Sequence, residues 1–417
     1  MQARLSSSAA KIPAVTQSPR RTSVGGVHWP ELDGLRALAI LLVVARHSLR
    51  PFISEDTYAP VAAWGGVDLT PFLMNGWVGV DLFFVLSGFL IGRQAFRRDG
   101  WGRFWFKRVT RIVPAYWACL ALVAVGLTAS GSWAESGRDF AAHLVMLQDY
   151  TGSVFVPAFW SLGAEEKFYL LAPLLAVGLA RLRSPVLQGA ALAGLWLAPV
   201  VFRILATRSV VPPVPYETYF PSFRSPFHLT CETLVLGFVI AWATLHLRPE
   251  VLGPRAREAV FWSGAAGLLV ALVPSALLGH IDRVTIMAMP AAIGLGFGAM
   301  VLACVSGPGS YSRCLSWRGW RPLALTSFSL YLTHMMVIPS AVNAGKAILG
   351  SGAHSVTAQW LAFLPGYLVL SAVTAWALYA AVERPVLLWR DRLLLRRRAA
   401  ALPSASTAPA PEAAPSL

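Results

Sequence analysis

The chain has 417 residues, of which 56% are hydrophobic and only 13% are charged. Soluble globular domains carry about 25% charged residues, so the composition excludes an ordinary soluble protein, a disordered chain and a coiled coil, and it indicates a polytopic membrane protein. The four cysteines lack CxxC spacing and provide no metal or redox motif.

Ten apolar stretches lie between two polar tails. Residues 1–30 are predicted to form a disordered tail, and residues 386–417 a basic and then Ala/Pro/Ser-rich disordered tail. A helix needs about 20 apolar residues to cross a bilayer. The sequence therefore predicts an all-α membrane domain over residues 31–385, a bundle of about ten transmembrane helices. The expected spans are 32–50, 76–93, 112–130, 159–180, 185–206, 228–247, 259–279, 284–305, 322–347 and 357–382.

The basic residues predict how this bundle is oriented. With the N-terminus inside, the cytoplasmic segments carry 25 Lys and Arg residues and the external loops carry 4. Positive residues accumulate on the cytoplasmic side of membranes. We therefore expect a multi-pass protein of a bacterial-type inner (cytoplasmic) membrane with both termini cytoplasmic. The lipid bilayer is then a partner, and the net charge of +15 requires no nucleic acid.

A polar stripe is predicted along the first span. Eleven residues separate Arg36 from His47, which turns a helix by about 1100° and advances it by about 16 Å, so both side chains share one face. Charged groups within spans are expensive and are candidates for function. The alternative is a structural ion pair, or an arginine that extends to the membrane surface.

Other spans are predicted to bring carboxylates to the depth of His47, near the outer face. Asp81 lies in the second span, and Glu165 and Glu166 lie in the fourth. A histidine beside carboxylates has the composition of a general base and its orienting group. The alternative is a set of separate buried ion pairs. The same layer contains Arg203 and Glu232.

The inner side is expected to present a cationic cluster. Residues 93–111 hold seven Lys and Arg residues among aromatic ones, including Arg103, Lys107, Arg108 and Arg111. Guanidinium forks suit a phosphate-bearing ligand, and Arg108 and Arg111, three residues apart, would face together. Contact with anionic lipid is the alternative. The glycines of residues 76–88 are expected to permit close helix packing.

Four stretches, at residues 32–48, 76–93, 103–117 and 159–173, resemble the acyltransferase-3 family of integral membrane O-acyltransferases, and residues 327–337 add a weaker match. The resemblance implies a ten-helix bundle that takes an acyl group, often acetyl, from cytosolic acyl-CoA. Acyl-CoA is then a donor substrate, and no cofactor is bound permanently. The acceptor is a hydroxyl, usually on a sugar, at the outer face. The chain resembles the stand-alone form without a C-terminal SGNH domain.

The resemblance also implies roles for individual residues. The family's Arg-x10-His motif falls on Arg36 and His47, with His47 as the catalytic histidine. Its Arg-x-x-Arg motif, implicated in acyl-CoA binding, falls on Arg108 and Arg111, next to Arg103 and Lys107. Its acidic pair falls on Glu165 and Glu166. Two positions depart from the family pattern, since Lys167 replaces a usual Gln and Phe328 a common Tyr.

Together these features predict a membrane O-acyltransferase that acts on a sugar-containing acceptor, such as a surface polysaccharide, a glycolipid or a glycosylated metabolite. His47 would be the general base or a transient acyl carrier, and Asp81, Glu165 or Glu166 would orient its ring. One alternative is a transporter that moves a sugar, lipid or proton along the same stripe. Another is a non-catalytic membrane sensor that has kept the fold.

Overall fold

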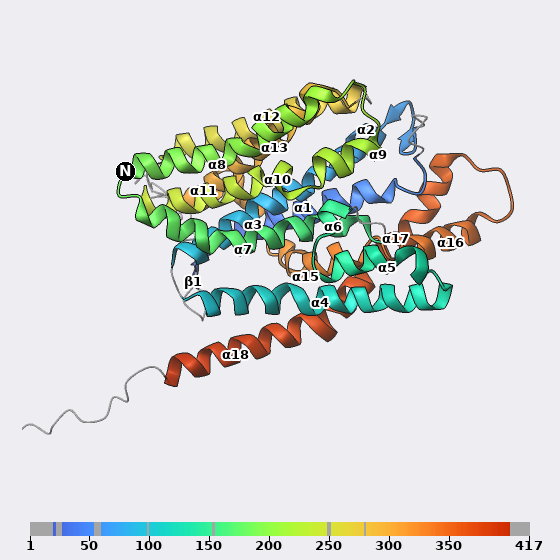
Figure 1. Ribbon diagram of the computed structural model, residues 1–417. Coiled ribbons are helices and arrows are strands. Elements are labelled where there is room, and N and C mark those ends of the chain that lie inside the picture. Colours follow the sequence, from blue (N-terminus) through green and yellow to red (C-terminus); the bar gives the residue numbers. More distant parts are fainter. Residues whose placement is uncertain are drawn as a thin grey trace, which may run out of the picture.

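The computed structural model describes residues 20–21, 27–53, 60–97, 100–151, 155–247, 252–278 and 281–400. Its long helices lie alongside one another as a bundle (Figure 1), which confirms the all-α prediction. They are α1 Pro30–Ser48, α3 Gly79–Phe96, α4 Trp101–Ser130, α5 Trp133–Leu144, α7 Trp160–Arg181, α8 Pro185–Ala206, α11 Glu232–His246, α12 Pro254–Leu278, α13 Arg283–Ser306, α15 Trp320–Thr333, α16 Ile338–Leu349, α17 Val356–Leu378 and α18 Arg384–Ala400.

Short elements connect these helices. Four two-residue strands form two antiparallel pairs. In the first, β1 Arg20–Arg21 pairs with β2 Val27–His28, and in the second, β3 Ala63–Trp64 pairs with β4 Val67–Asp68. The short helices are α2 Thr70–Met74, α6 Gln148–Thr151, α9 Tyr216–Tyr219, α10 Phe227–Thr230 and α14 Ser312–Leu315, with 3-10 turns η1 Asn75–Val78, η2 Pro157–Phe159 and η3 Thr207–Ser209 and π-helical turns η4 Phe220–Arg224 and η6 Tyr379–Glu383.

Each of the ten predicted spans overlaps one or more of the helices, but fewer helices are long and apolar enough to cross a membrane. Five described helical segments could cross a membrane on that basis, and α15 with α16 would make a sixth. Helix α1 is not among them because it carries four charged residues, Glu31, Asp33, Arg36 and Arg46. Helix α7 is not among them because it carries three consecutive charged residues, 165–167. The same charged residues that make these helices candidates for function also keep them from being counted as apolar membrane spans.

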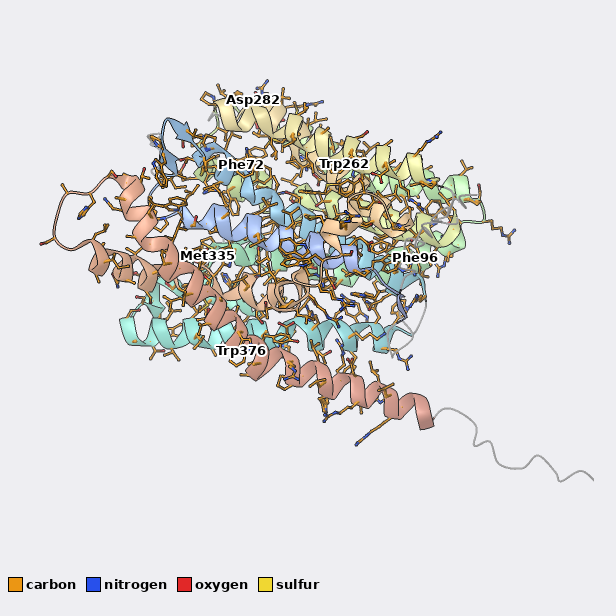
Figure 2. The ribbon with its side chains drawn as sticks, turned by 180° about the vertical axis from the view of Figure 1, so that it is seen from behind. Phe72, Phe96, Trp262, Asp282, Met335 and Trp376 are labelled. Atoms are coloured by element: carbon orange, nitrogen blue, oxygen red, sulfur yellow. The ribbon has the colours of Figure 1, made fainter. Side chains whose placement is uncertain are left out.

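The loops alternate between the two ends of the bundle. Figure 2 shows Phe72 and Asp282 toward one end and Phe96 toward the other. Asp282 caps α13, because its side chain accepts a hydrogen bond of 2.7 Å from the backbone N–H of Thr285, and that bond lowers the pKa of the Asp282 carboxyl. Phe72 and Asp282, which both belong to segments expected outside, thus lie at the same end.

Most residues of helix α3 are buried, and its glycines allow close contact with the neighbouring helices. A Cβ atom at Gly88 would collide with the carbonyl oxygen of Leu234 on α11, and one at Gly79 would collide with that of Ala39 on α1. The backbones approach so closely only because these side chains are absent. The predicted packing role of the glycines in residues 76–88 is confirmed.

Two segments differ from the sequence-based expectation. The predicted span 322–347 is not one straight helix, since α15 and α16 meet at 88°. Pro339 lies in the first turn of α16, where the missing N–H of proline is tolerated. In addition, the basic part of the expected C-terminal tail is helical to residue 400, because α18 continues from the π-helical turn η6. Residues 401–417 and 1–19 lie outside the described residues.

Candidate functional site

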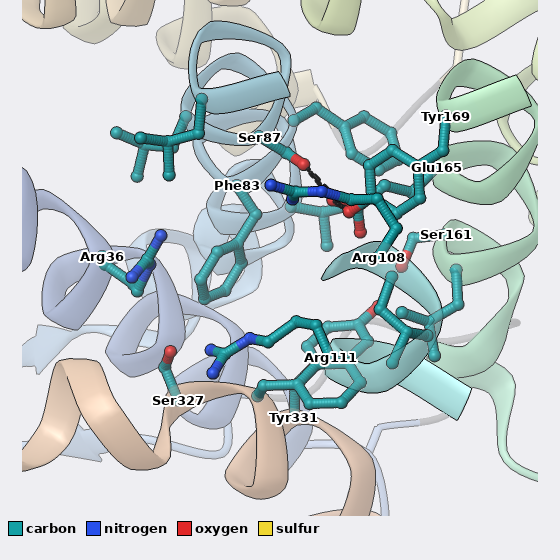
Figure 3. A pocket seen from close by; sticks show the side chains of 17 residues that line it. Arg36, Phe83, Ser87, Arg108, Arg111, Ser161, Glu165, Tyr169, Ser327 and Tyr331 are labelled. Carbon is teal, nitrogen blue, oxygen red and sulfur yellow. Dashed lines mark hydrogen bonds between the residues drawn. The ribbon is translucent and has the colours of Figure 1, made fainter. Parts of the chain in front are cut away.

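A cavity of about 120 Å³ lies among α1, α3, α4, α7 and α15. Its walls mix apolar side chains with polar ones that come from all five helices. Figure 3 shows that Arg36, Arg108 and Arg111 reach into the same space as Ser87 and Glu165. The other polar lining residues are Ser161, Tyr169, Ser327 and Tyr331.

Glu165 is held on one side of the cavity by two hydroxyl groups. Ser87 Oγ from α3 and Tyr169 OH from the next turn of α7 both donate hydrogen bonds to Glu165 Oε1. The two hydroxyl oxygens are 3.2 Å apart, and the Arg108 guanidinium lies 5.6 Å from the centre of the Tyr169 ring. Glu165 therefore accepts hydrogen bonds from two hydroxyl groups, and a guanidinium group lies over the ring of one of these donors.

The three arginines of the cavity differ in how they are paired. Arg111 forms an ion pair of 2.6 Å with Glu383, which also accepts a hydrogen bond of 2.7 Å from Ser329 Oγ. Among the described residues, no carboxylate forms an ion pair with Arg36 or Arg108, and Nε of Arg108 is buried without a hydrogen-bond partner. Guanidinium groups that lack an ion-pair partner and line a cavity favour an anionic or strongly polar ligand.

His47 lies next to another histidine. Its Nδ1 is 3.1 Å from Nε2 of His334, and the two ring centres are 5.0 Å apart. His334 is buried at the C-terminal end of α15, and its ring centre lies 5.9 Å from that of Tyr331. Tyr331 lines the cavity and hydrogen-bonds Ser161 at 2.6 Å. The Tyr331 ring thus lies between the cavity and the histidine pair.

The carboxylates expected beside His47 have other partners. Asp81 forms a two-point ion pair with Arg224, with distances of 3.1 and 2.8 Å to the two guanidinium nitrogens. Glu232 pairs with Arg203 at 2.6 Å, and both side chains are fully buried. At Asp81 and Glu232 the structure therefore shows the separate buried ion pairs that the sequence left open as the alternative.

The remaining predicted residues lie near the cavity but are not part of its lining. Arg103 and Lys107 precede Arg108 on α4, and Glu166 follows Glu165 on α7. Lys167 points toward the segment between α5 and η2, where its amine donates hydrogen bonds of 2.6 Å to Asp149 and 2.8 Å to the carbonyl of Met146. The Lys167 amine therefore fixes α6 against α7.

Sequence reasoning missed four residues that the structure places in or against the site. His334 could have been found, because it is a histidine within an expected span and within the matching stretch 327–337. Ser87 could not, because it lies among the small residues of 76–88 that were assigned to helix packing. Arg224 belongs to an expected external loop, and Glu383 lies just past the last expected span, 357–382, within the predicted membrane domain. No sequence spacing links Arg224 to Asp81, 143 residues away, or Glu383 to Arg111.

Comparison with known proteins matches residues 29–380 to the family model described as an acyltransferase domain. The peptidoglycan O-acetyltransferase OatA of Listeria monocytogenes is 27% identical over 76% of this chain and 51% of its own length. The putative peptidoglycan O-acetyltransferase YrhL of Bacillus subtilis is also 27% identical, over 74% of this chain and 48% of its own length. The chain thus spans about half the length of these two relatives.

A third relative is similar over almost its whole length. The acyltransferase MdmB of Streptomyces mycarofaciens is 27% identical over 93% of this chain and 98% of its own length. No solved structure matches the chain.

Proposed function

Because the chain belongs to the acyltransferase-3 family of multi-pass membrane proteins, we propose that it transfers an acyl group, in the simplest case acetyl, from cytosolic acyl-CoA to a hydroxyl of a sugar-containing acceptor. The observation that carries the proposal is the cavity: Arg36 and Arg108, which form no ion pair among the described residues, line it together with Tyr331, and the Tyr331 ring lies next to the His47–His334 pair. The similarity to OatA, a peptidoglycan O-acetyltransferase, and to YrhL, a putative one, supports acetyl as the group transferred.

The cationic face of α4 would bind the donor. Arg108 and Arg111 line the cavity, and Arg103 and Lys107 extend the charge toward the start of the helix. Guanidinium forks bind phosphate oxygens through paired N–H groups, so these residues suit the phosphates of CoA. The thioester arm would then pass Arg36, which lines the same cavity from α1. No cofactor other than the donor is required.

In the transfer step, His47 would act as general base. It takes the proton of the acceptor hydroxyl as the oxygen attacks the thioester carbonyl, the carbon–sulfur bond breaks, and the proton returns to the CoA thiolate. The products are the ester and free CoA. General-base assistance contributes about 10²–10⁴-fold to such a reaction. A transient acyl-His47 would give the same products in two steps.

For this reaction the protein must cross the membrane, and we propose ten crossings with both ends cytoplasmic. The crossings would be α1, α3, α4, α7, α8, α11, α12, α13, the α15–α16 pair and α17. Figure 1 shows β1 and the last turns of α18 at the same end of the bundle, which requires an even number of crossings. The basic residues favour the cytoplasmic side of a bacterial-type inner membrane for that end.

The test is release of CoA by the purified full-length protein. Wild type should release CoA from acetyl-CoA when a crude cell-envelope glycan fraction is added, and His47→Ala should lower the rate by about 10²–10⁴-fold while it remains folded. His354→Ala is the matched control, because His354 is exposed and bonds only the Leu349 carbonyl through its ring. Near-normal CoA release by His47→Ala would overturn the mechanism. Solute flux by wild type without CoA release would instead indicate a transporter.

A further inference from the structure

Two histidines that are 287 residues apart in sequence meet through their ring nitrogens. His334 is fully buried and His47 is half-buried. Nε2 of His334 lies 3.1 Å from Nδ1 of His47, and Nδ1 of His334 lies 3.0 Å from the carbonyl oxygen of Leu330. Each of these hydrogen bonds needs one donor and one acceptor.

The Leu330 carbonyl determines the direction of both bonds. A carbonyl oxygen only accepts, so Nδ1 of His334 carries a proton. A neutral imidazole has a single N–H, and Nε2 of His334 is therefore an acceptor. The proton of the second bond must then reside on Nδ1 of His47, which leaves the lone pair of His47 on Nε2.

The surroundings oppose a second proton on either ring. A buried imidazolium without a counter-charge is costly. The positive charges of Arg46 and Arg50 act on His47, and among the described residues no carboxylate hydrogen-bonds to His47 or His334. Both rings are therefore neutral in the resting protein, as the assignment of the two protons requires.

We propose that His334 is a positioning residue, which holds His47 in its Nδ1–H tautomer and thereby makes Nε2 the basic nitrogen. This inference rests on the proposed role of His47 as general base. A carboxylate orients the histidine in Ser-His-Asp triads, and here a neutral imidazole bound to a backbone carbonyl takes that place. Because His334 is buried and tied to its own helix, it also limits rotation of the His47 ring.

The tautomer can be measured directly by ¹⁵N NMR of the full-length protein in lipid nanodiscs, labelled at histidine. His47→Ala assigns the His47 signals by their disappearance. In wild type, Nδ1 of His47 should be protonated and Nε2 unprotonated, and in His334→Leu the population protonated at Nε2 should rise. Protonation of His47 at Nε2 in the wild type would overturn the proposal.

Two substitutions separate hydrogen bonding from packing. His334→Gln retains a side-chain carbonyl that can accept from Nδ1 of His47, whereas His334→Leu offers no acceptor. His334→Leu should lower kcat by about 10²–10⁴-fold with little change in the donor KM. His334→Gln should recover most of that loss. Equal losses of kcat in two well-folded variants would mean that His334 acts only through packing.

A neighbouring residue provides the control. Thr333 precedes His334 on α15 and hydrogen-bonds only the carbonyl of Ser329 through its side chain, so Thr333→Val should leave kcat and the His47 tautomer unchanged. The NMR result does not depend on turnover. If wild type transfers no acyl group, the proposed function fails, and the protonation state of His47 still decides the role of His334.

Discussion

Arg224 illustrates, at the scale of single residues, how this protein accommodates a buried charge. Its guanidinium bonds both oxygens of Asp81 and also Thr230 Oγ1, at 3.1 Å. It lies 5.0 and 5.1 Å from the ring centres of Trp77 and Trp160. Two-point pairing satisfies the charge, and the two rings add cation–π attraction. The pair joins the π-helical turn η4 to α3.

Removal of either partner should therefore destabilise the protein. Asp81→Asn leaves the Arg224 charge without its counter-charge, and Arg224→Ala leaves the Asp81 carboxylate alone; each should cost about 3–5 kcal/mol of unfolding free energy. The double variant Asp81→Leu with Arg224→Met should cost less than either, because no buried charge remains. Thermal unfolding in detergent measures all three. If Asp81→Asn abolished CoA release without lowering the unfolding temperature, Asp81 would act in the chemistry instead.

At the scale of helices, the contact between α3 and α11 positions Ser87 for its bond to Glu165. Gly88 is the neighbour of Ser87, and its Cα faces the Leu234 carbonyl on α11. Gly88→Ala should force the helices apart and lower stability by about 1–3 kcal/mol. Gly126→Ala on α4 is the matched control, because an added Cβ meets nothing within 4 Å there. The control should stabilise by about 0.5–1 kcal/mol.

Thermal unfolding of the two glycine variants, in the same detergent, checks this prediction. Opposite shifts in the unfolding temperature are expected. A Gly88→Ala variant as stable as wild type would show that α3 and α11 do not need this close approach. CoA release by the same variant reports whether displacement of Ser87 disturbs the cavity.

The positions of the long helices could be predicted from the sequence, but the points where a helix bends or is interrupted could not. Apolar runs indicated where the long helices lie, because hydrophobicity averages over about 20 residues. The 88° turn between α15 and α16 depends on a few residues around Pro339, and such local effects are lost in the average. The helical form of residues 386–400 was also missed, because its charged composition resembles that of a tail.

At the scale of the whole molecule, the site combines residues that sequence could identify with partners that it could not. Arg36, Arg108, Arg111 and Glu165, all predicted, line one cavity. Depth in the membrane suggested a carboxylate beside His47, but depth does not determine which helices are neighbours, and the structure places His334 there. Which side chains become partners depends on which helices pack side by side, and the hydrophobic pattern of the sequence does not specify this.

The orientation of the bundle in the membrane can be tested by labelling a native cysteine. Cys314 on α14 is exposed, whereas the other three cysteines are buried. Its loop lies between α13 and α15 and belongs to the cytoplasmic side in the ten-crossing arrangement. A membrane-impermeant maleimide should therefore label Cys314 only after intact cells are permeabilised. Val67 lies in the exposed β3–β4 pair at the opposite end, so Val67→Cys in a Cys314→Ser background should be labelled in intact cells.

The two labels decide the arrangement together. Labelling of Cys314 in intact cells, with Val67→Cys protected, would reverse the orientation and place the α4 arginines away from cytosolic acyl-CoA. Labelling of both positions from outside would contradict the number of crossings between them. Protection of Cys314 with labelling of Val67→Cys is the outcome that the charge distribution requires, because 25 of the 35 Lys and Arg residues lie on the side assigned to the cytoplasm.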